Sequence, residues 1–155
     1  MSENALFKTA LSKTMSQCSR REFCSDDIRN KLLLLGVGNN DTEKIISILI
    51  KENFISDSRY ATAFAKDKFN YNKWGKIKIA KHLRVKNIPG DIIRMSLDAI
   101  DNELYQKTLH ELISCHRRFI KARSQYDLKA KLLRYGLSKG FESSLLYDIL
   151  NDLED

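Results

Sequence analysis

The sequence predicts an all-α fold, made of three tandem three-helix repeats that form an elongated array. Apolar residues recur at helical spacing along the chain, and strictly alternating strand patterns are absent. The 155 residues include only one proline and six glycines, so helix-breaking residues are rare. Three ten-residue segments also align without gaps: IRNKLLLLGV at 28–37, IAKHLRVKNI at 79–88 and LKAKLLRYGL at 128–137.

The aligned segments share a pattern of apolar residue, leucine four positions later, then glycine or asparagine four positions beyond. The three leucines, predicted to be equivalent core positions, are Leu32, Leu83 and Leu132. A three-helix unit of this size is too small to be stable alone, so neighbouring units are expected to pack end to end. The predicted repeats are residues 1–53, 54–101 and 102–155, of which the second is the most basic.

In the first repeat, a helix is predicted over about residues 4–16. Ser25 suits the N-cap of a second helix, because its side chain accepts a hydrogen bond from a free amide and acidic residues follow it. Gly36 suits the left-handed position just past the end of that helix. Asn40 and Glu43 have capping-box spacing and are expected to start the third helix.

In the second repeat, Asp57 is the expected N-cap of a helix that breaks at residues 70–72, before Gly75. The next helix runs to Asn87, a residue type that tolerates the left-handed conformation. Pro89 is expected at the start of the third helix, where a missing amide N–H costs little.

In the third repeat, a long helix is predicted over about residues 102–122. Ser124 and Asp127 resemble a capping box for the next helix, which is expected to stop at Gly136. The last helix is predicted over about residues 141–153.

The composition indicates a basic, intracellular protein. Lysine and arginine number 27 against 20 acidic residues, which favours a polyanionic partner, nucleic acid first and an acidic protein or membrane surface next. Plain solubility is the alternative explanation. Three cysteines without a C-x-x-C pair are typical of a reducing compartment. The most apolar run, residues 45–50, is too short to span a bilayer, so a cytoplasmic protein without membrane contact is expected.

The second repeat concentrates basic residues on exposed helical positions. On a helical wheel Ile79 and Leu83 share one face, and Lys78 and Lys81 lie opposite. A solvated helix face usually mixes acids with lysines, so the single sign of charge favours anion binding. The predicted site for DNA or for a nucleoprotein filament comprises Lys66, Lys73, Trp74, Lys76, Lys78, Lys81, Arg84, Lys107, Arg118 and Lys121.

The role of the aromatic residues in this region stays open at this point. Tyr71 and Trp74 lie in the turn beside the lysines, where they either stack on exposed bases or cover a hydrophobic core. His116 falls on an apolar helix face and is expected to be packed rather than to bind a ligand.

Motifs typical of enzymes are absent. No phosphate-binding P-loop occurs, and Gly36 and Gly38 lack the further glycine of a dinucleotide-binding loop. No nucleophile has histidine and acid partners at a recognisable spacing. The cysteines lack zinc-site spacing. A protein without catalytic activity, cofactor or metal is therefore expected.

The central segment resembles the RecX family, whose members are bacterial regulators of the RecA recombinase. The likeness extends more loosely over nearly the whole chain. Asn87 stands where the family often has glycine, which leaves the basic face unchanged. The residues that carry the resemblance are Ile55, Ser56, Asp57, Ser58, Arg59, Tyr60, Ala61, Phe64, Trp74, Gly75, Ile77, Ile79, Leu83, Lys86, Asn87 and Ile88.

The resemblance implies a monomeric regulator that lodges in the helical groove of the RecA–single-stranded DNA filament. Such a protein inhibits the recombinase, ATPase and co-protease activities of RecA in homologous recombination, DNA repair and the SOS response. Weak, electrostatic binding to free single-stranded DNA is also expected.

Two other classes compete with this interpretation. One is a sequence-independent helical DNA-binding protein that acts without RecA, and the other is a scaffold that binds only protein. A DNA-binding helix-turn-helix reads base edges, whereas the exposed lysines here suit phosphates better. Binding to DNA with a steep salt dependence would exclude the protein-only scaffold.

Overall fold

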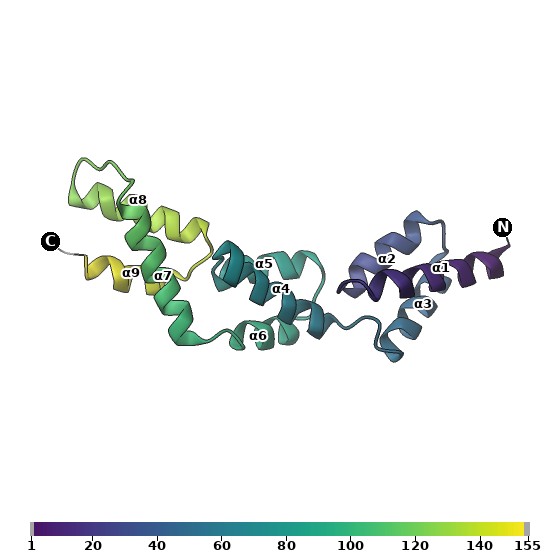
Figure 1. Cartoon of the computed structure of the whole chain (residues 1–155). Coiled ribbons are helices and arrows are strands. Elements are labelled where there is room, and N and C mark those ends of the chain that lie inside the picture. The colour runs from purple at the N-terminus through teal and green to yellow at the C-terminus, as the bar shows by residue number, and fades with distance from the viewer. Residues whose placement is uncertain (1, 154–155) are drawn as a thin grey trace. The chain divides into compact units, whose positions relative to one another are not determined.

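The computed structural model describes residues 2–153, and these form nine α-helices without any strand. Figure 1 labels these helices along the chain. The predicted all-α, repeat-built fold is therefore confirmed. The helices are α1 (Glu3–Cys18), α2 (Ser25–Leu34), α3 (Asn39–Lys51), α4 (Asp57–Asn72), α5 (Lys76–Val85), α6 (Gly90–Asp98), α7 (Asn102–Arg117), α8 (Gln125–Ser138) and α9 (Ser143–Asn151).

The described residues fall into two compact units. The first unit holds the chain up to Ala63 together with Leu83–Ile93, and the second holds Phe64–His82 together with the chain from Arg94 onward. Helices α4, α5 and α6 each contribute residues to both units. The repeat boundaries after residues 53 and 101 stay a prediction.

The first unit is built around branched aliphatic side chains. Helices α2 and α3 pack against each other, and α1 contacts α3. The partly buried Leu6, Phe7 and Leu11 of α1 cover the cluster. The buried members of this core are Ala10, Phe23, Ile28, Leu32, Val37, Ile45, Ile46, Leu49 and Ile55.

The second unit is built around aromatic rings as well as aliphatic residues. Helix α8 packs against both α7 and α9. The buried ring of Tyr105 lies between Phe69 and Phe141, with centroid distances of 5.6 and 5.1 Å. Rings at such distances gain favourable contacts beyond simple burial. The side chain of Phe69, at the end of α4, is thereby held against α7.

The three leucines predicted to be equivalent core positions are all fully buried. Leu32, Leu83 and Leu132 have 0% of their surface exposed. The periodicity therefore located the inward face of all three helices correctly.

Two of the predicted helix ends are confirmed by the backbone. Gly36 and Asn87 have φ angles of 87° and 58°, in the left-handed region. The following residues close the helix: the Val37 N–H donates to the Leu32 carbonyl at 3.1 Å, and the Ile88 N–H donates to the Leu83 carbonyl at 3.2 Å. This bond pattern satisfies carbonyl groups that a helix end otherwise leaves free.

The predicted end of the eighth helix at Gly136 is wrong. Helix α8 continues to Ser138, and Gly140 takes the left-handed position with a φ of 91°. The Phe141 N–H donates to the Gly136 carbonyl at 3.2 Å, as Val37 does to Leu32. A Cβ on Gly136 would lie 2.3 Å from Leu146 Cδ2, so this glycine serves close packing of α9 instead of a turn.

Several other boundaries differ by a few residues. Helix α7 ends at Arg117 instead of residue 122, and the amides of Arg118, Phe119 and Ile120 donate to carbonyls only three residues back. Cys24, not Ser25, occupies the N-cap position of α2. Gly38 occupies the N-cap position of α3, two residues before the predicted Asn40. No helix within residues 2–153 combines the length and apolarity needed to cross a membrane.

Candidate functional site

The candidate site in the second unit is organised around Trp74. Helix α4 ends at Asn72, and Lys73 reverses the chain with a φ of 59°. The Trp74 N–H then donates to the Lys68 carbonyl at 3.1 Å. This turn places the half-buried indole next to α4 and the first turns of α5. His82 stacks on the indole, with ring centroids 4.5 Å apart and 28° between the planes.

Two lysines from different helices lie over the same indole. The ammonium nitrogens of Lys68 and Lys78 are 4.9 and 4.7 Å from the Trp74 ring centroid. The electron-rich face of an indole attracts a cation at this distance. We call Lys68, Trp74, Lys78 and His82 the Trp74 cluster.

The lysines around the cluster have no acidic partners. The Lys73 ammonium donates to the Asn70 carbonyl, and the Lys139 ammonium donates to the Asn72 carbonyl, each at 2.8 Å. Within the described residues, no carboxylate forms an ion pair with these two lysines or with Lys68, Lys78 and Lys81. Their charges therefore create an uncompensated positive field, which attracts anions.

The electrostatic effect of this crowding is visible in two pKa values. Burial, followed by the charges of Lys78, Lys68 and Lys81, lowers the pKa of His82 below its ordinary value. Burial and the charge of Lys78 also lower the pKa of Lys139. A bound anion would offset the part of each shift that comes from the neighbouring lysine charges, but not the part that comes from burial.

The first turn of α5 is held in place by the α8–α9 connection and by α7. The amide of Gly75 donates to the Lys139 carbonyl at 2.7 Å, and that of Ile77 donates to the Gly140 carbonyl at 3.0 Å. The Lys76 amide donates to the Tyr105 hydroxyl oxygen at 2.9 Å, and this hydroxyl in turn donates to the Glu142 carboxylate. These amides are therefore occupied, and an anion at the site must bind to side chains.

Two glycines permit this docking. A Cβ on Gly75 would lie 2.3 Å from the Gly140 carbonyl carbon, and a Cβ on Gly140 would lie 2.2 Å from the Lys78 Cβ. Real side chains do not approach so closely, so both positions require glycine. The backbone at Gly140 thus sets the position of Lys78.

The structure brings together only part of the predicted site. Trp74 and Lys78 belong to the cluster, and the charge of Lys81 acts on His82. The Lys76 ammonium lies over the Tyr105 ring instead, 4.9 Å from its centroid. Lys66, Lys107, Arg118 and Lys121 are exposed elsewhere in the second unit, and Arg84 is exposed in the first unit. Anion binding by all ten residues stays a prediction.

Three residues of this region were absent from the predicted site. Lys68 and His82 lie in the basic segment. No pattern in the sequence indicates that their side chains contact Trp74 across the turn. Lys139 lies 61 positions beyond Lys78 in the chain, so only the fold shows their proximity. The predicted packing of His116 agrees with its ring stacking on Tyr135, with centroids 3.7 Å apart.

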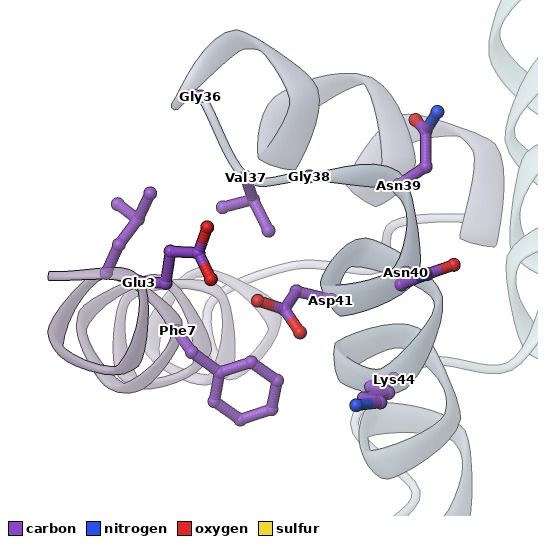
Figure 2. A pocket seen from close by; sticks show the side chains of 10 residues that line it. Glu3, Phe7, Gly36, Val37, Gly38, Asn39, Asn40, Asp41 and Lys44 are labelled. Carbon is purple, nitrogen blue, oxygen red and sulfur yellow. The ribbon is translucent and has the colours of Figure 1, made fainter.

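A cleft in the first unit has a different character. Figure 2 shows the Glu3 and Asp41 carboxylates turned toward the hollow between α1 and the start of α3, with Phe7 and Val37 beside them. The cleft has a volume of about 650 Å³. Lys44 is the single cation among its lining residues, so the cleft does not suit a polyanion.

Cys24 is a buried thiol without the features of a reactive cysteine. Burial raises the pKa of Cys24 to about 11, which keeps this thiol protonated at neutral pH. Within residues 2–153, no group of three or more histidine, cysteine or acidic side chains is arranged to hold a metal ion.

Comparison with known proteins places the site within a recognised family. Residues 56–97, which include the whole Trp74 cluster, match the family model described as RecX, second three-helix domain. The regulatory protein RecX of Clostridium acetobutylicum is 30% identical over 148 residues, covering 93% of this chain and 68% of that protein. This chain belongs to the RecX family.

A second relative shows how much of a RecX protein the chain represents. The regulatory protein RecX of Clostridium botulinum (strain Eklund 17B / Type B) is 31% identical over 129 residues, covering 81% of this chain. The chain spans 59% of the length of that relative. Both of these relatives are named as regulatory proteins.

Two solved structures share the fold. The crystal structure of RecX from Lactobacillus salivarius superposes with a TM-score of 0.84 at 20% identity and covers 97% of both chains. A crystal structure of regulatory protein RecX superposes with a TM-score of 0.87 at 23% identity, covering 97% of this chain and 73% of the other. At these identities the likeness concerns the helical repeat fold.

Proposed function

We propose that this protein is a regulator of the RecA recombinase that binds the RecA–single-stranded DNA filament and inhibits its recombinase, ATPase and co-protease activities. In this role it acts without catalysis, in the cytoplasm, during DNA repair and the SOS response. Membership of the RecX family supports the proposal. The observation that carries it further is the uncompensated positive charge around Trp74.

The chemistry of the Trp74 cluster fits phosphate groups. Lys68 and Lys78 lie on an aromatic surface, and no carboxylate neutralises them. Lysine ammonium groups bind phosphates as point charges and do not discriminate between bases. The cluster is therefore suited to following a DNA backbone of any sequence, which a filament-binding regulator requires.

The side chains around Trp74 also restrict how it binds DNA. His82 covers one face of the indole, and Lys68 and Lys78 lie over the ring system. The indole therefore supports the cations, and base stacking on Trp74 is not part of the proposal. A polyanion is expected to contact the lysines and His82.

The test uses a double charge reversal, Lys78→Glu with Lys81→Glu, in an assay of DNA-dependent ATP hydrolysis by RecA. The wild-type protein is expected to inhibit hydrolysis, and the variant is expected to require a much higher concentration. A matched control, Lys8→Glu with Lys13→Glu, makes the same change in net charge on exposed residues of α1. This control is expected to inhibit like the wild type. Circular dichroism of each variant verifies that its helices remain.

Direct DNA binding provides a second measurement. Trp74 is the only tryptophan in the chain, so its fluorescence reports directly on the cluster. Titration with single-stranded DNA is expected to change this fluorescence, with a salt slope reduced by about 0.7 for each lysine contact removed. If DNA binds but RecA activity is unaffected, the alternative of a sequence-independent DNA-binding protein that acts without RecA replaces the proposal.

A further inference from the structure

The loop between α7 and α8, together with the first turn of α8, exposes two aromatic side chains among cations; we call this segment the α7–α8 loop. Residues 117–126, RRFIKARSQY, contain three arginines and one lysine and no acidic residue. Phe119 is 79% exposed and Tyr126 is 85% exposed. Isolated exposed aromatics are common, but two of them within a ten-residue basic segment form an unusual surface.

This loop, visible between α7 and α8 in Figure 1, is held by specific hydrogen bonds. At its start, the Phe119 N–H donates to the His116 carbonyl at 3.0 Å. In its middle, the Lys131 ammonium donates to the Lys121 carbonyl at 2.7 Å. At its end, the Arg123 N–H donates to the Asp127 carboxylate at 3.0 Å. The loop is therefore already ordered, which reduces the entropy lost when a ligand binds.

The charges of the loop remain available to a ligand. Asp127, the acid that follows it, accepts the Arg123 N–H and forms an ion pair with Lys131 at 3.2 Å. Within the described residues, no carboxylate forms an ion pair with Arg118, Lys121 or the guanidinium of Arg123. Flat apolar rings and free cations are thus exposed on one short segment.

We propose that the α7–α8 loop binds the unpaired bases of single-stranded nucleic acid. Phe119 and Tyr126 stack on bases, while Arg118, Lys121 and Arg123 hold the adjoining phosphates. Stacking requires a free base face, which a duplex does not offer within its interior, so the loop favours single strands over duplexes. The inference rests on the proposed function in one respect, that nucleic acid is the polyanion.

An acidic protein surface is the other class of partner for such a loop, and the observations favour nucleic acid. Phe119 on the loop and Tyr126 in the first turn of α8 are exposed side chains rather than members of an apolar groove that would receive a helix. Alternation of cations and aromatics matches the alternation of phosphates and bases along a single strand.

The experiment compares two fluorescein-labelled probes, a 20-nucleotide oligothymidine and an abasic oligomer of equal length. The probes carry the same phosphates, but only one has bases. The wild-type protein is expected to bind oligothymidine at least about fivefold more tightly. Phe119→Ala with Tyr126→Ala is expected to bind both probes equally, with an unchanged salt slope because no cation is removed.

Two control variants make the result specific. Tyr147→Ala removes an exposed tyrosine of α9 that is followed by Asp148, and it is expected to keep the wild-type preference for bases. Tyr126→Phe keeps a flat ring and is expected to keep the preference as well. Because the replaced side chains are exposed, thermal melting of all variants should match the wild type.

The possible outcomes separate this inference from the proposed function. A wild-type protein that binds both probes equally, or a double alanine variant that keeps the preference, overturns the inference. A double variant that keeps the preference yet no longer inhibits RecA identifies the loop as a protein-binding surface, which also overturns it. Inhibition of ATP hydrolysis by the wild type is measured independently, so its absence counts against the proposed function alone.

Discussion

The ion-paired cations of the first unit contrast with the lysines of the Trp74 cluster in the second, although Arg21 and Lys31 of the first unit also lie over the Phe23 ring and Lys131 of the second pairs with Asp127. In the first unit, Arg29 pairs with Glu43 at 2.8 Å, Arg59 with Glu22 at 2.9 Å, and Lys86 with Asp27 at 2.6 Å. In the second unit, the lysines of the Trp74 cluster lie on an aromatic ring instead. A surface ion pair contributes little to stability but neutralises the field around it. The lysines of the Trp74 cluster keep their field because no carboxylate pairs with them, which makes this cluster more suitable for an anionic partner than the ion-paired cations.

The units also differ in what their left-handed glycines do. Gly36 and Gly140 both have positive φ, but a Cβ on Gly36 would meet no atom within 4 Å, whereas one on Gly140 would collide with Lys78. The first glycine satisfies only backbone geometry. The second also permits the close approach that positions part of the Trp74 cluster.

The largest expected effect tests that difference. Gly36→Ala should lower the free energy of unfolding by about 1–2 kcal/mol, the cost of a left-handed residue with a Cβ. Gly140→Ala adds a backbone collision and should cost about 3 kcal/mol or more. Urea unfolding followed by circular dichroism measures both. Equal losses for the two variants would show that the docking of α5 on Gly140 contributes nothing.

The next effect concerns the paired and unpaired lysines. Lys86→Met leaves the half-buried carboxylate of Asp27 without its partner and should cost about 1 kcal/mol of unfolding free energy. Lys78→Met removes a cation that has no acidic partner, so stability should be unchanged or slightly raised. Urea unfolding at low salt measures both variants. A larger loss for Lys78→Met would reverse the comparison.

Acid should weaken the first unit through Asp27. Burial alone would raise the pKa of Asp27, but the hydrogen bond and charge of Lys86 lower it below the ordinary value of 3.8. The folded state therefore binds this proton less readily than the unfolded state. The resulting stabilisation is complete above pH 3.8 and is lost as the pH falls through the folded pKa. Wild type and Asp27→Asn should differ in stability at pH 7 and converge as the pH falls below the lowered pKa of Asp27 in the folded state.

The smallest expected effect is a pH dependence of DNA binding by the second unit. The pKa of His82 is lowered by burial and by three lysines, and a bound polyanion offsets those charges and raises it. Binding therefore takes up a proton, and affinity should increase as the pH falls from about 7.5 to 5.5, by up to about tenfold for one unit of pKa change. His82→Gln should remove this increase. Titration of Trp74 fluorescence at several pH values measures it, and a persistent increase in the variant would assign it to another group.

The sequence by itself determined the features that depend on local periodicity and backbone preference. The spacing of apolar residues located the helices and the buried Leu32, Leu83 and Leu132, because a helix face repeats every 3.6 residues. The glycine and asparagine after the first two of these leucines identified left-handed helix ends, because few other residues adopt that conformation at low cost. The basic character of residues 64–82 is likewise a property of the chain alone.

Only the tertiary structure decided which side chains meet. Lys68 and Lys78 share the Trp74 ring because a left-handed turn at Lys73 folds two helices around it, and no local preference specifies that contact. The extra turn of α8, and with it the roles of Gly136 and Gly140, follows from packing against α9 and α5. Such contacts depend on close fit between side chains, and the one between Gly140 and Lys78 joins positions 62 residues apart, which the pattern of a single sequence does not encode.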